Sequence, residues 1–418
     1  MIRFQKITTI YPEFAVPFRK QYPDYASLAY DELHERLITA CYGWSDYFAK
    51  YLGQRGYEAQ ELFANFELLQ KAWARENGVR FTRRNWLQEI TLAQVKAFQP
   101  DVLFLEDLYV CDGDFRAQVR DECKRPVKII GWRAALTEDY GVLKDLDLVL
   151  TCAPVFIEAM ARHGIKAELM SHAFEPSILD KVGPAASPLD FTFIGIIALT
   201  SGFHGQRYRM VERLMETTPL EMWGEIIAPA VRTGNGNLIT RWTGRANGAI
   251  ERVLGERLKL PGIGRATSAN TQPEDPIKQR QPEKFHESVF GLDNFRLLGR
   301  SRLTFNCHID CAESSAGNAR LFEATGMGAC LITDWKTNLP QLFEPDTEVV
   351  TYRSIEECIE KVKYLLDHEP QRQRIAAAGQ KRTLRDHTYV KRAAQLDEII
   401  RSPGEGRADR SPAYSLPA

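Results

Sequence analysis

The residues best suited to chemistry stand close together in the segment 316–328. Arg320 and Glu323 are three positions apart, and Gly317 comes shortly before them. Arginine can grip a phosphate through two parallel hydrogen bonds, and a carboxylate can accept both hydroxyls of a ribose. A helix that begins here adds backbone N–H groups and partial positive charge, which suit a diphosphate. By residue chemistry alone, a plain ion pair on an exposed helix face explains the same two side chains equally well.

A second candidate segment runs from Gly195 to Arg209. It has the pattern of a strand, a glycine-containing loop and a helix, with His204 just before Arg207. Backbone N–H groups of such a loop can face a phosphate, and an arginine can neutralise it. We favour Arg207 over Arg209 because it lies closer to the loop. The alternative is the solvated start of a basic helix.

Five further side chains are candidates for contact with a ligand. Asp46 follows a Gly-Trp-Ser turn, where it suits a general base or a ligand of an acceptor hydroxyl, and a helix cap explains it as well. Trp44 suits a sugar ring or a protein core. His172 suits a bound donor or a buried hinge. Asn306 and His308 end a strand whose carboxyl end we expect at a cleft.

The elements around these residues alternate between strands and helices. Short apolar runs predict buried parallel strands. They fall at residues 2–10, 57–63, 100–106, 126–132, 146–152 and 167–172, and again at 191–197, 220–224, 301–306, 329–333 and 348–352. Helical periodicity appears at residues 31–41, 65–76, 87–98, 154–163, 205–217, 355–367, 370–383 and 389–400, whereas the Pro- and Tyr-rich residues 11–26 favour a loop. This alternation predicts an α/β fold of two Rossmann-like parallel-sheet domains that face each other across a cleft.

The predicted domain boundaries follow shifts in composition. They are a first domain at 1–176, a linker at 177–190, a second domain at 191–385 with an irregular insertion at 228–285, a helix at 386–401 that packs back on the first domain, and a disordered polar tail at 402–418.

Composition excludes several classes of protein. A net charge of −1 over 418 residues gives no electrostatic case for nucleic acid. The N-terminus lacks the pattern of a signal peptide, and no apolar run is long enough to cross a membrane. The eight cysteines are scattered, so we expect reduced thiols in a cytoplasmic protein and not a zinc site. Asp310 and Glu313 are the remaining candidates for a divalent ion.

An ordered series of residues from about 290 to 400 resembles the donor domain of GT-B glycosyltransferases, in particular the CgeB-like branch of the glycosyltransferase group 1 superfamily. The series comprises Asn306, His308, Gly317, Asn318, Arg320, Glu323, Gly326, Gly328, Thr333, Asp334, Leu342, Phe343, Pro345, Glu348, Tyr352, His387, Tyr389 and Arg392.

The resemblance implies a function as well as a fold. Glu323 would bind the ribose of a nucleotide, and Arg320 and the turn before it would lie near the diphosphate. Gly195, His204 and Arg207 would belong to the same donor site. The first domain, at 1–176, would bind the acceptor and the second, at 191–385, the nucleotide-sugar donor, with the aromatic segment 11–47 and the insertion 228–285 shaping the acceptor site. The expected reaction moves a sugar from a nucleotide-sugar to a hydroxyl of a glycan, glycoconjugate or protein. Retention is usual in this superfamily, and we expect neither a metal ion nor a cofactor. The sequence departs from the common Glu-x7-Glu pair because Ser315 stands where the first Glu is expected.

Two other functions fit the same fold. One is a nucleotide-sugar 2-epimerase, and the other is a non-catalytic protein that binds a nucleotide-sugar or a glycan. An NAD-dependent dehydrogenase is a weaker alternative, because no GxGxxG follows a first strand.

Overall fold

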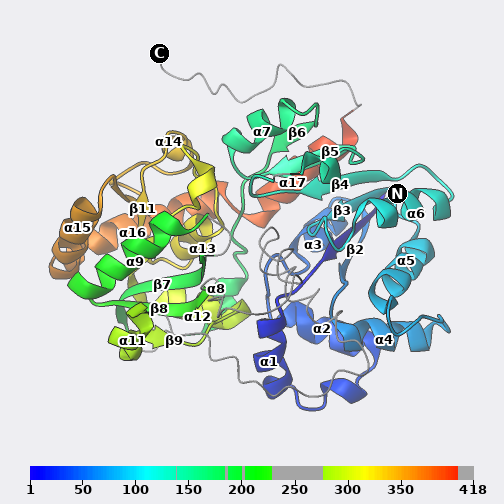
Figure 1. The fold of residues 1–418 in the computed structure, drawn as a ribbon, viewed down its shortest axis with the longest axis horizontal. Helices are drawn as coiled ribbons and strands as arrows, with labels where there is room; N and C mark the ends of the chain where they lie inside the picture. The colour runs from blue at the N-terminus through cyan, green and yellow to red at the C-terminus, as the bar shows by residue number, and fades with distance from the viewer. Residues whose placement is uncertain (138, 184–186, 200–202, 228–275, 403–418) are drawn as a thin grey trace, which may run out of the picture.

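The computed structural model describes residues 1–137, 139–183, 187–199, 203–227 and 276–402, and they form two lobes (Figure 1). Each lobe contains a sheet of six parallel strands. The first sheet has the order β2 (Glu58–Phe63), β1 (Arg3–Thr8), β3 (Val102–Leu105), β4 (Lys128–Trp132), β5 (Leu148–Thr151) and β6 (Ala167–Leu169). The second has the order β12 (Val350–Tyr352), β11 (Cys330–Asp334), β10 (Ser301–Asn306), β7 (Leu189–Ala198), β8 (Leu220–Ile227) and β9 (Phe285–His286). The predicted fold class is confirmed.

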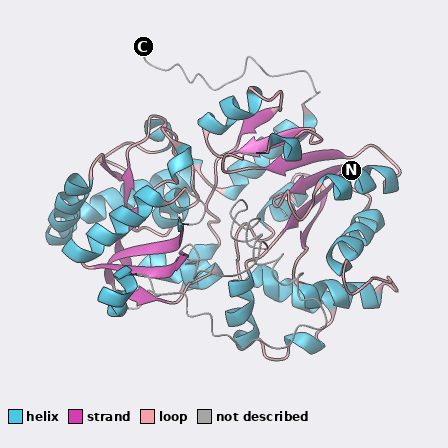
Figure 2. Ribbon diagram, viewed as in Figure 1, coloured by secondary structure: helices cyan, strands magenta, loops and turns pink. Residues whose placement is uncertain are grey.

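Helices surround both sheets (Figure 2). Those of the first lobe are α1 (Pro12–Gln21), α2 (Tyr30–Thr39), α3 (Tyr47–Gly53), α4 (Glu67–Glu76), α5 (Trp86–Phe98), α6 (Gly113–Glu122) and α7 (Pro154–Ala161). After α8 (Ile178–Val182), the second lobe has α9 (Gly205–Thr217), α11 (Pro276–Arg280), α12 (Gly291–Arg300), α13 (Arg320–Gly326), α14 (Leu339–Leu342), α15 (Ile355–Asp367) and α16 (Glu369–Asp386), and α17 (Tyr389–Arg401) follows. The helices predicted from periodicity are confirmed, with ends that differ by a few residues.

The predicted loop at residues 11–26 is wrong, because α1 occupies much of it. Proline is well tolerated in the first turn of a helix, and Pro12 stands there. Phe14 and Phe18, four residues apart, share one face of the helix and are buried in an aromatic cluster with Tyr42 and Phe66. Burial of these rings outweighs a composition that is typical of loops.

The predicted linker is also more structured than expected. Residues 178–182 form α8, and β7 already begins at Leu189. Residues 184–186 lie outside the described chain, as do residues 228–275 of the predicted insertion and 403–418 of the predicted tail. The described end of the insertion contains α11 and β9.

The last helix, α17, packs against α3 of the first lobe (Figure 1). The Tyr57 hydroxyl donates to Asp397 Oδ1 at 2.7 Å, and Arg392 Nε donates to the Ser171 carbonyl at 2.9 Å. The Tyr47 and Tyr389 rings pack with centroids 4.8 Å apart. A single apolar core therefore continues from the first sheet through α17 to α13.

The strand order reverses once in each sheet, between β1 and β3 in the first and between β7 and β10 in the second. In open parallel sheets, ligands bind in the crevice beyond the carboxyl ends of the strands at such a reversal. Each lobe therefore offers one topological crevice, which we call the first crevice (β1/β3) and the second crevice (β7/β10). No helix in the described part of the chain has the length and apolarity of a membrane span.

Candidate active site

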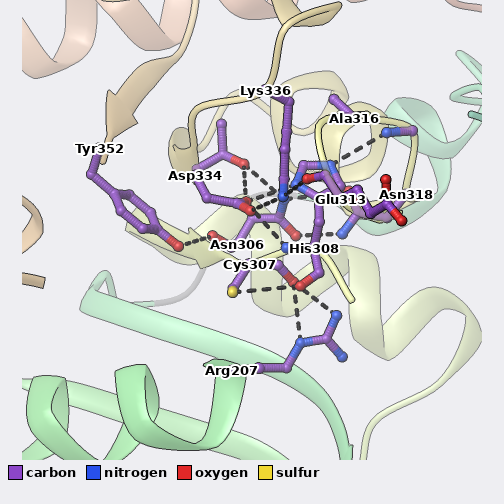
Figure 3. A network of polar contacts seen from close by, with 12 residues as sticks. Arg207, Asn306, Cys307, His308, Glu313, Ala316, Asn318, Asp334, Lys336 and Tyr352 are labelled. Carbon is purple, nitrogen blue, oxygen red and sulfur yellow. Dashed lines mark hydrogen bonds and ion pairs between the residues drawn. The ribbon is translucent and has the colours of Figure 1, made fainter. Parts of the chain in front are cut away.

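The loop between β10 and α13, residues 307–319, is held in place by the loop after β11. His308 Nδ1 lies 2.7 Å from Asp334 Oδ1, and the Gly317 N–H donates to His308 Nε2 at 3.3 Å (Figure 3). Because Nε2 accepts a hydrogen bond, the proton of the ring is on Nδ1, which donates a hydrogen bond to Asp334 Oδ1. Burial alone would raise the pKa of Asp334, but His308 and Lys336 outweigh it and hold that pKa far below its usual range. Buried His308 thus orients the Gly317 turn.

Further contacts fix the middle of this loop. The Ala316 N–H donates to Asn338 Oδ1 at 2.6 Å, and Asn338 Nδ2 donates to the Ala316 carbonyl at 2.9 Å. Lys336 Nζ donates to the carbonyl of Glu313, whose φ of 47° is unusual for a residue with a side chain. Backbone strain of this kind persists only where the surroundings enforce it. The loop is therefore preorganised.

Asn306 and Asn318 hold each other. Asn318 Nδ2 donates to Asn306 Oδ1 at 2.6 Å, and Asn306 Nδ2 donates to Thr333 Oγ1 at 2.9 Å. These side chains close the carboxyl end of β10 and set the direction in which the chain enters α13.

Three backbone N–H groups at the start of α13 have no acceptor among the described residues. They belong to Asn318, Ala319 and Arg320. Successive N–H groups without a partner can receive the oxygen atoms of an anion. Asn318 and Ala319 also line a cavity between the two lobes.

The cavity has a volume of about 110 Å³. The first lobe contributes Ala134, Cys152, Ala153, Phe156 and His172, and the second contributes His308, Ile309, Ala312, Ser315, Gly317, Asn318 and Ala319. The predicted residues His172, His308, Gly317 and Asn318 thus meet at one place, although they come from different lobes.

The two lobes touch at the edge of this cavity. A Cβ atom on Gly317 would lie only 2.2 Å from the Cys152 carbonyl oxygen, so only glycine fits there. Ser315 Oγ accepts from the Val155 N–H in the first turn of α7 at 3.3 Å. Gly317 therefore serves the close approach of the lobes. Ser315, at the position expected for a Glu, caps a helix of the other lobe.

Arg207 crosses the second crevice. Its Nε and Nη2 donate to the Cys307 carbonyl at 3.1 and 2.8 Å, and its Nη1 donates to the Ile196 carbonyl at 3.4 Å (Figure 3). Within the described chain, no carboxylate lies within 4 Å of this guanidinium. The positive charge therefore bridges the ends of β7 and β10, and the described residues provide no carboxylate in contact with it.

His204 reinforces this donor surface. Its Nδ1 accepts from the Ala198 N–H at 2.7 Å, so in the neutral ring the proton sits on Nε2, which faces Arg207 Nη1 at 3.3 Å. Burial lowers the pKa of His204 to about 4, and Arg207 adds to the effect. A neutral N–H donor thus stands beside a guanidinium that has no carboxylate partner among the described residues, an arrangement that suits an oxyanion.

The first backbone N–H groups of α9 already donate to a side chain of the protein. Asp310 Oδ2 accepts from the N–H groups of Gly205 and Gln206 at 3.0 and 3.3 Å. Asp310 therefore acts as a helix cap, and these two N–H groups are not open to a phosphate as we expected. Gly195 lies inside β7, where a Cβ on the neighbouring Gly224 would come within 1.9 Å of its carbonyl oxygen.

Arg320 and Glu323 form an ion pair at 3.0 Å, with side chains only 16% and 22% exposed. Arg320 also donates to Asn294 Oδ1 at 2.9 Å and to the Ile194 carbonyl at 3.2 Å. The ion pair of the alternative explanation is therefore present, although both side chains are mostly buried, and the binding role of the two residues stays a prediction. Arg320 thus connects α13 to α12 and β7 through hydrogen bonds, and Glu323 lies in the first turn of α13 beside it.

His172 packs between Trp44 and Trp132, with ring centroids 5.7 and 5.1 Å away. Its Nδ1 is buried and has no hydrogen-bond partner among the described groups. Burial lowers the pKa of His172 to about 4, which makes it neutral at physiological pH. Trp44 is 8% exposed and belongs to the core of the first lobe.

Asp46 does not line the cavity. It precedes α3, and its side chain makes no capping hydrogen bond. Burial raises its pKa, opposed by Lys50 and Lys181. The residues that sequence reasoning missed are Lys336 and Asn338, together with the role of Asp334. The pair Thr333-Asp334 at the end of β11 was the available signal, but which loop it holds depends on the neighbouring strand.

All eight cysteines are unpaired, and no group of three or more His, Cys, Asp or Glu side chains in the described residues is arranged to hold a metal ion.

The architecture has known counterparts. Sucrose-phosphate synthase from Thermosynechococcus elongatus superposes with a TM-score of 0.54 at 10% identity, covering 96% of this chain and 98% of that one. The Anabaena protein Alr3699/HepE in complex with UDP-glucose also gives 0.54, at 9% identity, with 96% and 99% covered. A glycosyltransferase from Rickettsia africae gives 0.52, at 10% identity, with 95% and 97% covered. The fold is therefore GT-B.

Sequence comparison adds a partial match. Residues 210–398 match the family described as "Glycosyl transferase-like". No curated protein shows significant sequence similarity. The matched segment contains α13, the loop that holds it and Glu323, but it begins after Arg207 and leaves out the first lobe.

Proposed function

We propose that the protein is a glycosyltransferase that moves a sugar from a nucleoside-diphosphate sugar to a hydroxyl of a glycan, glycoconjugate or protein. The observation that carries this proposal is the second crevice. Its charge comes from Arg207, a largely buried guanidinium without a carboxylate partner among the described residues. The GT-B fold and the match of residues 210–398 support the same assignment.

The proposed division of labour follows from position. Arg207, the N–H of His204 and the free N–H groups of Asn318–Arg320 would stabilise the negative charge that grows on the leaving diphosphate. Glu323 would accept the ribose hydroxyls, with Arg320 holding its carboxylate in place. The donor sugar would then enter the cavity between His172 and the Gly317 turn.

Two finer features belong to this proposal. We propose retention at the anomeric carbon, to be checked by the anomeric coupling constant of the product in proton NMR. We also propose that protein groups, and no metal ion, balance the diphosphate charge. Transfer should then survive EDTA. Activity restored only by a divalent cation would contradict this.

The decisive experiment is a thermal-shift screen with UDP, GDP, ADP and dTDP, repeated with the corresponding nucleotide-sugars. A nucleotide that binds the folded state raises its melting temperature according to occupancy. At least one should do so, and its nucleotide-sugar should release the diphosphate faster when an acceptor is added. If no nucleotide shifts the wild type, the donor site is wrong.

The variant Glu323→Ala sharpens this experiment. A carboxylate on the ribose distinguishes UDP from 2′-deoxy-UDP, so the variant should bind both equally and UDP about tenfold more weakly. Glu360→Ala, an exposed carboxylate on α15, is the matched control and should bind as the wild type does.

The alternatives appear as distinct products. Hydrolysis of the donor with inversion at C2, independent of acceptor, would indicate an epimerase. Binding without turnover on any acceptor would indicate a binding protein.

A further inference from the structure

The first crevice contains a charged cluster that the proposed donor site does not use. Lys6, in the centre of β1, is fully buried, and its Nζ lies 2.8 Å from both Glu61 Oε1 and Glu106 Oε2. Thr8 Oγ1 donates to the same oxygen of Glu106. These residues come from β2, β1 and the end of β3, the three neighbouring strands at the reversal of the sheet.

The three charged side chains differ in their access to solvent. Lys6 and Glu61 are 0% exposed, whereas the side chain of Glu106 is 26% exposed. The hydrogen bonds from Lys6 and Thr8 both use Glu106 Oε2, and no described residue donates to Oε1. One carboxylate oxygen is therefore fixed from inside the sheet, and the other is available at the carboxyl end of the strands.

The charges of the cluster favour this arrangement. Burial raises the pKa of Glu61 to about 8, although Lys6 opposes the shift. Burial alone would lower the pKa of Lys6, but Glu106 and Glu61 outweigh it and raise that pKa. Lys6 therefore stays an ammonium ion in contact with both carboxyl groups. Glu61 Oε2 is buried and has no hydrogen-bond partner among the described residues, so the cluster does not satisfy all its own polar atoms within this part of the chain.

The neighbours of Glu106 connect it to the boundary between the lobes. Its charge acts on His172, whose partnerless Nδ1 is on a residue that lines the cavity. Tyr11 follows Thr8, which donates to Glu106, by three positions; the residue is 43% exposed, and its ring packs near Phe290 of the second lobe, with centroids 6.5 Å apart. A carboxylate and a partly exposed aromatic residue are groups that bind sugar hydroxyls and the apolar face of a sugar.

We propose that Glu106 binds the acceptor: Lys6 and Thr8 hold Oε2, and Oε1 accepts a hydrogen bond from a hydroxyl of a sugar acceptor that lies against Tyr11. This inference rests on the proposed function, because it assigns the second substrate of the same reaction. It places the acceptor at the first crevice and the donor at the second, with His172 and the cavity between them.

The test measures acceptor and donor binding separately. The probes are the methyl glycosides of glucose, galactose, mannose and N-acetylglucosamine, titrated by saturation-transfer NMR in the presence of saturating UDP or whichever diphosphate binds. At least one glycoside should bind the wild type. Glu106→Gln should raise its Kd at least tenfold and leave the Kd of the nucleotide unchanged. Tyr11→Ala should weaken the same glycoside severalfold.

The controls separate binding from folding. Gln can still accept from Lys6 and Thr8, so Glu106→Gln should remain folded, and its unchanged nucleotide affinity verifies this. Glu106→Asp keeps the charge and should recover part of the affinity. Glu58→Gln removes a carboxylate paired with Arg3 at the opposite end of the same sheet and should change nothing.

The possible outcomes are distinct. An unchanged glycoside Kd in Glu106→Gln, or no binding of any glycoside to the wild type while the nucleotide binds, overturns the inference and leaves the donor site intact. Failure of every nucleotide to bind instead refutes the proposed function.

Discussion

The two crevices occupy equivalent places in their sheets but carry opposite chemistry. The first crevice has two carboxylates around one buried lysine. The second has a guanidinium held by two backbone carbonyls, with no carboxylate within 4 Å in the described chain. In the first crevice, Lys6 is paired with two carboxylates, and Glu106 Oε1 accepts no hydrogen bond from a described residue. In the second crevice, Arg207 has no carboxylate partner among the described residues.

This difference shows how one architecture can serve two substrates. An unpaired buried cation favours a diphosphate, whereas a fixed carboxylate with a free oxygen favours neutral hydroxyl groups and repels phosphate. Under the proposed function, the same topology would hold the sugar donor at the second crevice and the sugar acceptor at the first. The comparison predicts that variants at the first crevice change acceptor binding or stability, and that variants at the second change nucleotide binding.

The largest expected effect is on stability at the first crevice. Lys6→Met leaves the buried Glu61 and the partly exposed Glu106 without their cation, which should lower the free energy of unfolding by about 3–5 kcal/mol in urea titrations. Lys71→Met, in an exposed pair with Glu67, should cost no more than about 0.5 kcal/mol. Equal losses in the two variants would mean that the Lys6 cluster is no more than a solvated pair.

The next effect is on donor binding at the second crevice. Arg207→Ala should raise the Kd of the nucleoside diphosphate about 100-fold in calorimetry, because a charge-assisted contact is lost from a largely buried site. Arg209→Ala, on the exposed side of the same helix, is the control and should bind normally. If Arg209→Ala weakened binding as much, the assignment of the phosphate to Arg207 would be wrong.

A smaller effect is expected where the crevices approach each other. Gly317→Ala would force its Cβ against the Cys152 carbonyl and push the lobes apart. Transfer should slow about tenfold or more, because misplaced reactants react slowly, while nucleotide affinity stays within about threefold. Gly53→Ala, with no atom within 4 Å of the added carbon, should keep full activity. Full activity in Gly317→Ala would show that this contact is not needed for catalysis.

The smallest effect concerns pH. Burial raises the pKa of Glu61 to about 8, so the folded state binds its proton more tightly than the unfolded state. This contribution to stability is present at pH 4 and is lost as the pH rises through 8. Glu61→Gln cannot titrate, so its melting temperature should fall less than that of the wild type between pH 5 and 8, by about 2–4 °C. Parallel melting curves would show that Glu61 is ionised throughout.

Much of the fold was predictable because it depends on local patterns. The apolar runs of β3 and β5 are buried at every position, as expected for inner parallel strands. The helix at 205–217 begins and ends where periodicity placed it. The prediction of a loop in the α1 region was wrong because its prolines and tyrosines are typical of loops, whereas residues distant in the sequence bury Phe14 and Phe18.

The site was predictable only in part. Proximity in the sequence predicted one group of candidate residues, because the end of β10, the loop after it and α13 carry them. They are Asn306, His308, Asn318, Arg320 and Glu323. It did not show that His308 would be bound by Asp334, or that Asp310 would take the first N–H groups of α9. Those contacts join neighbouring elements whose order in the sheet is not written in any single segment.

The sequence by itself determined the alternation of strands and helices and the segment with Gly317, Arg320 and Glu323, since these follow from periodicity and short-range spacing. Only the tertiary structure decided that Lys6, Glu61 and Glu106 share one crevice. Glu61 and Glu106, which are 55 and 100 positions away from Lys6 in the sequence, contact it because β1 lies between β2 and β3 in a fixed register. Strand order and register are set by the packing of the whole sheet, which local sequence does not specify.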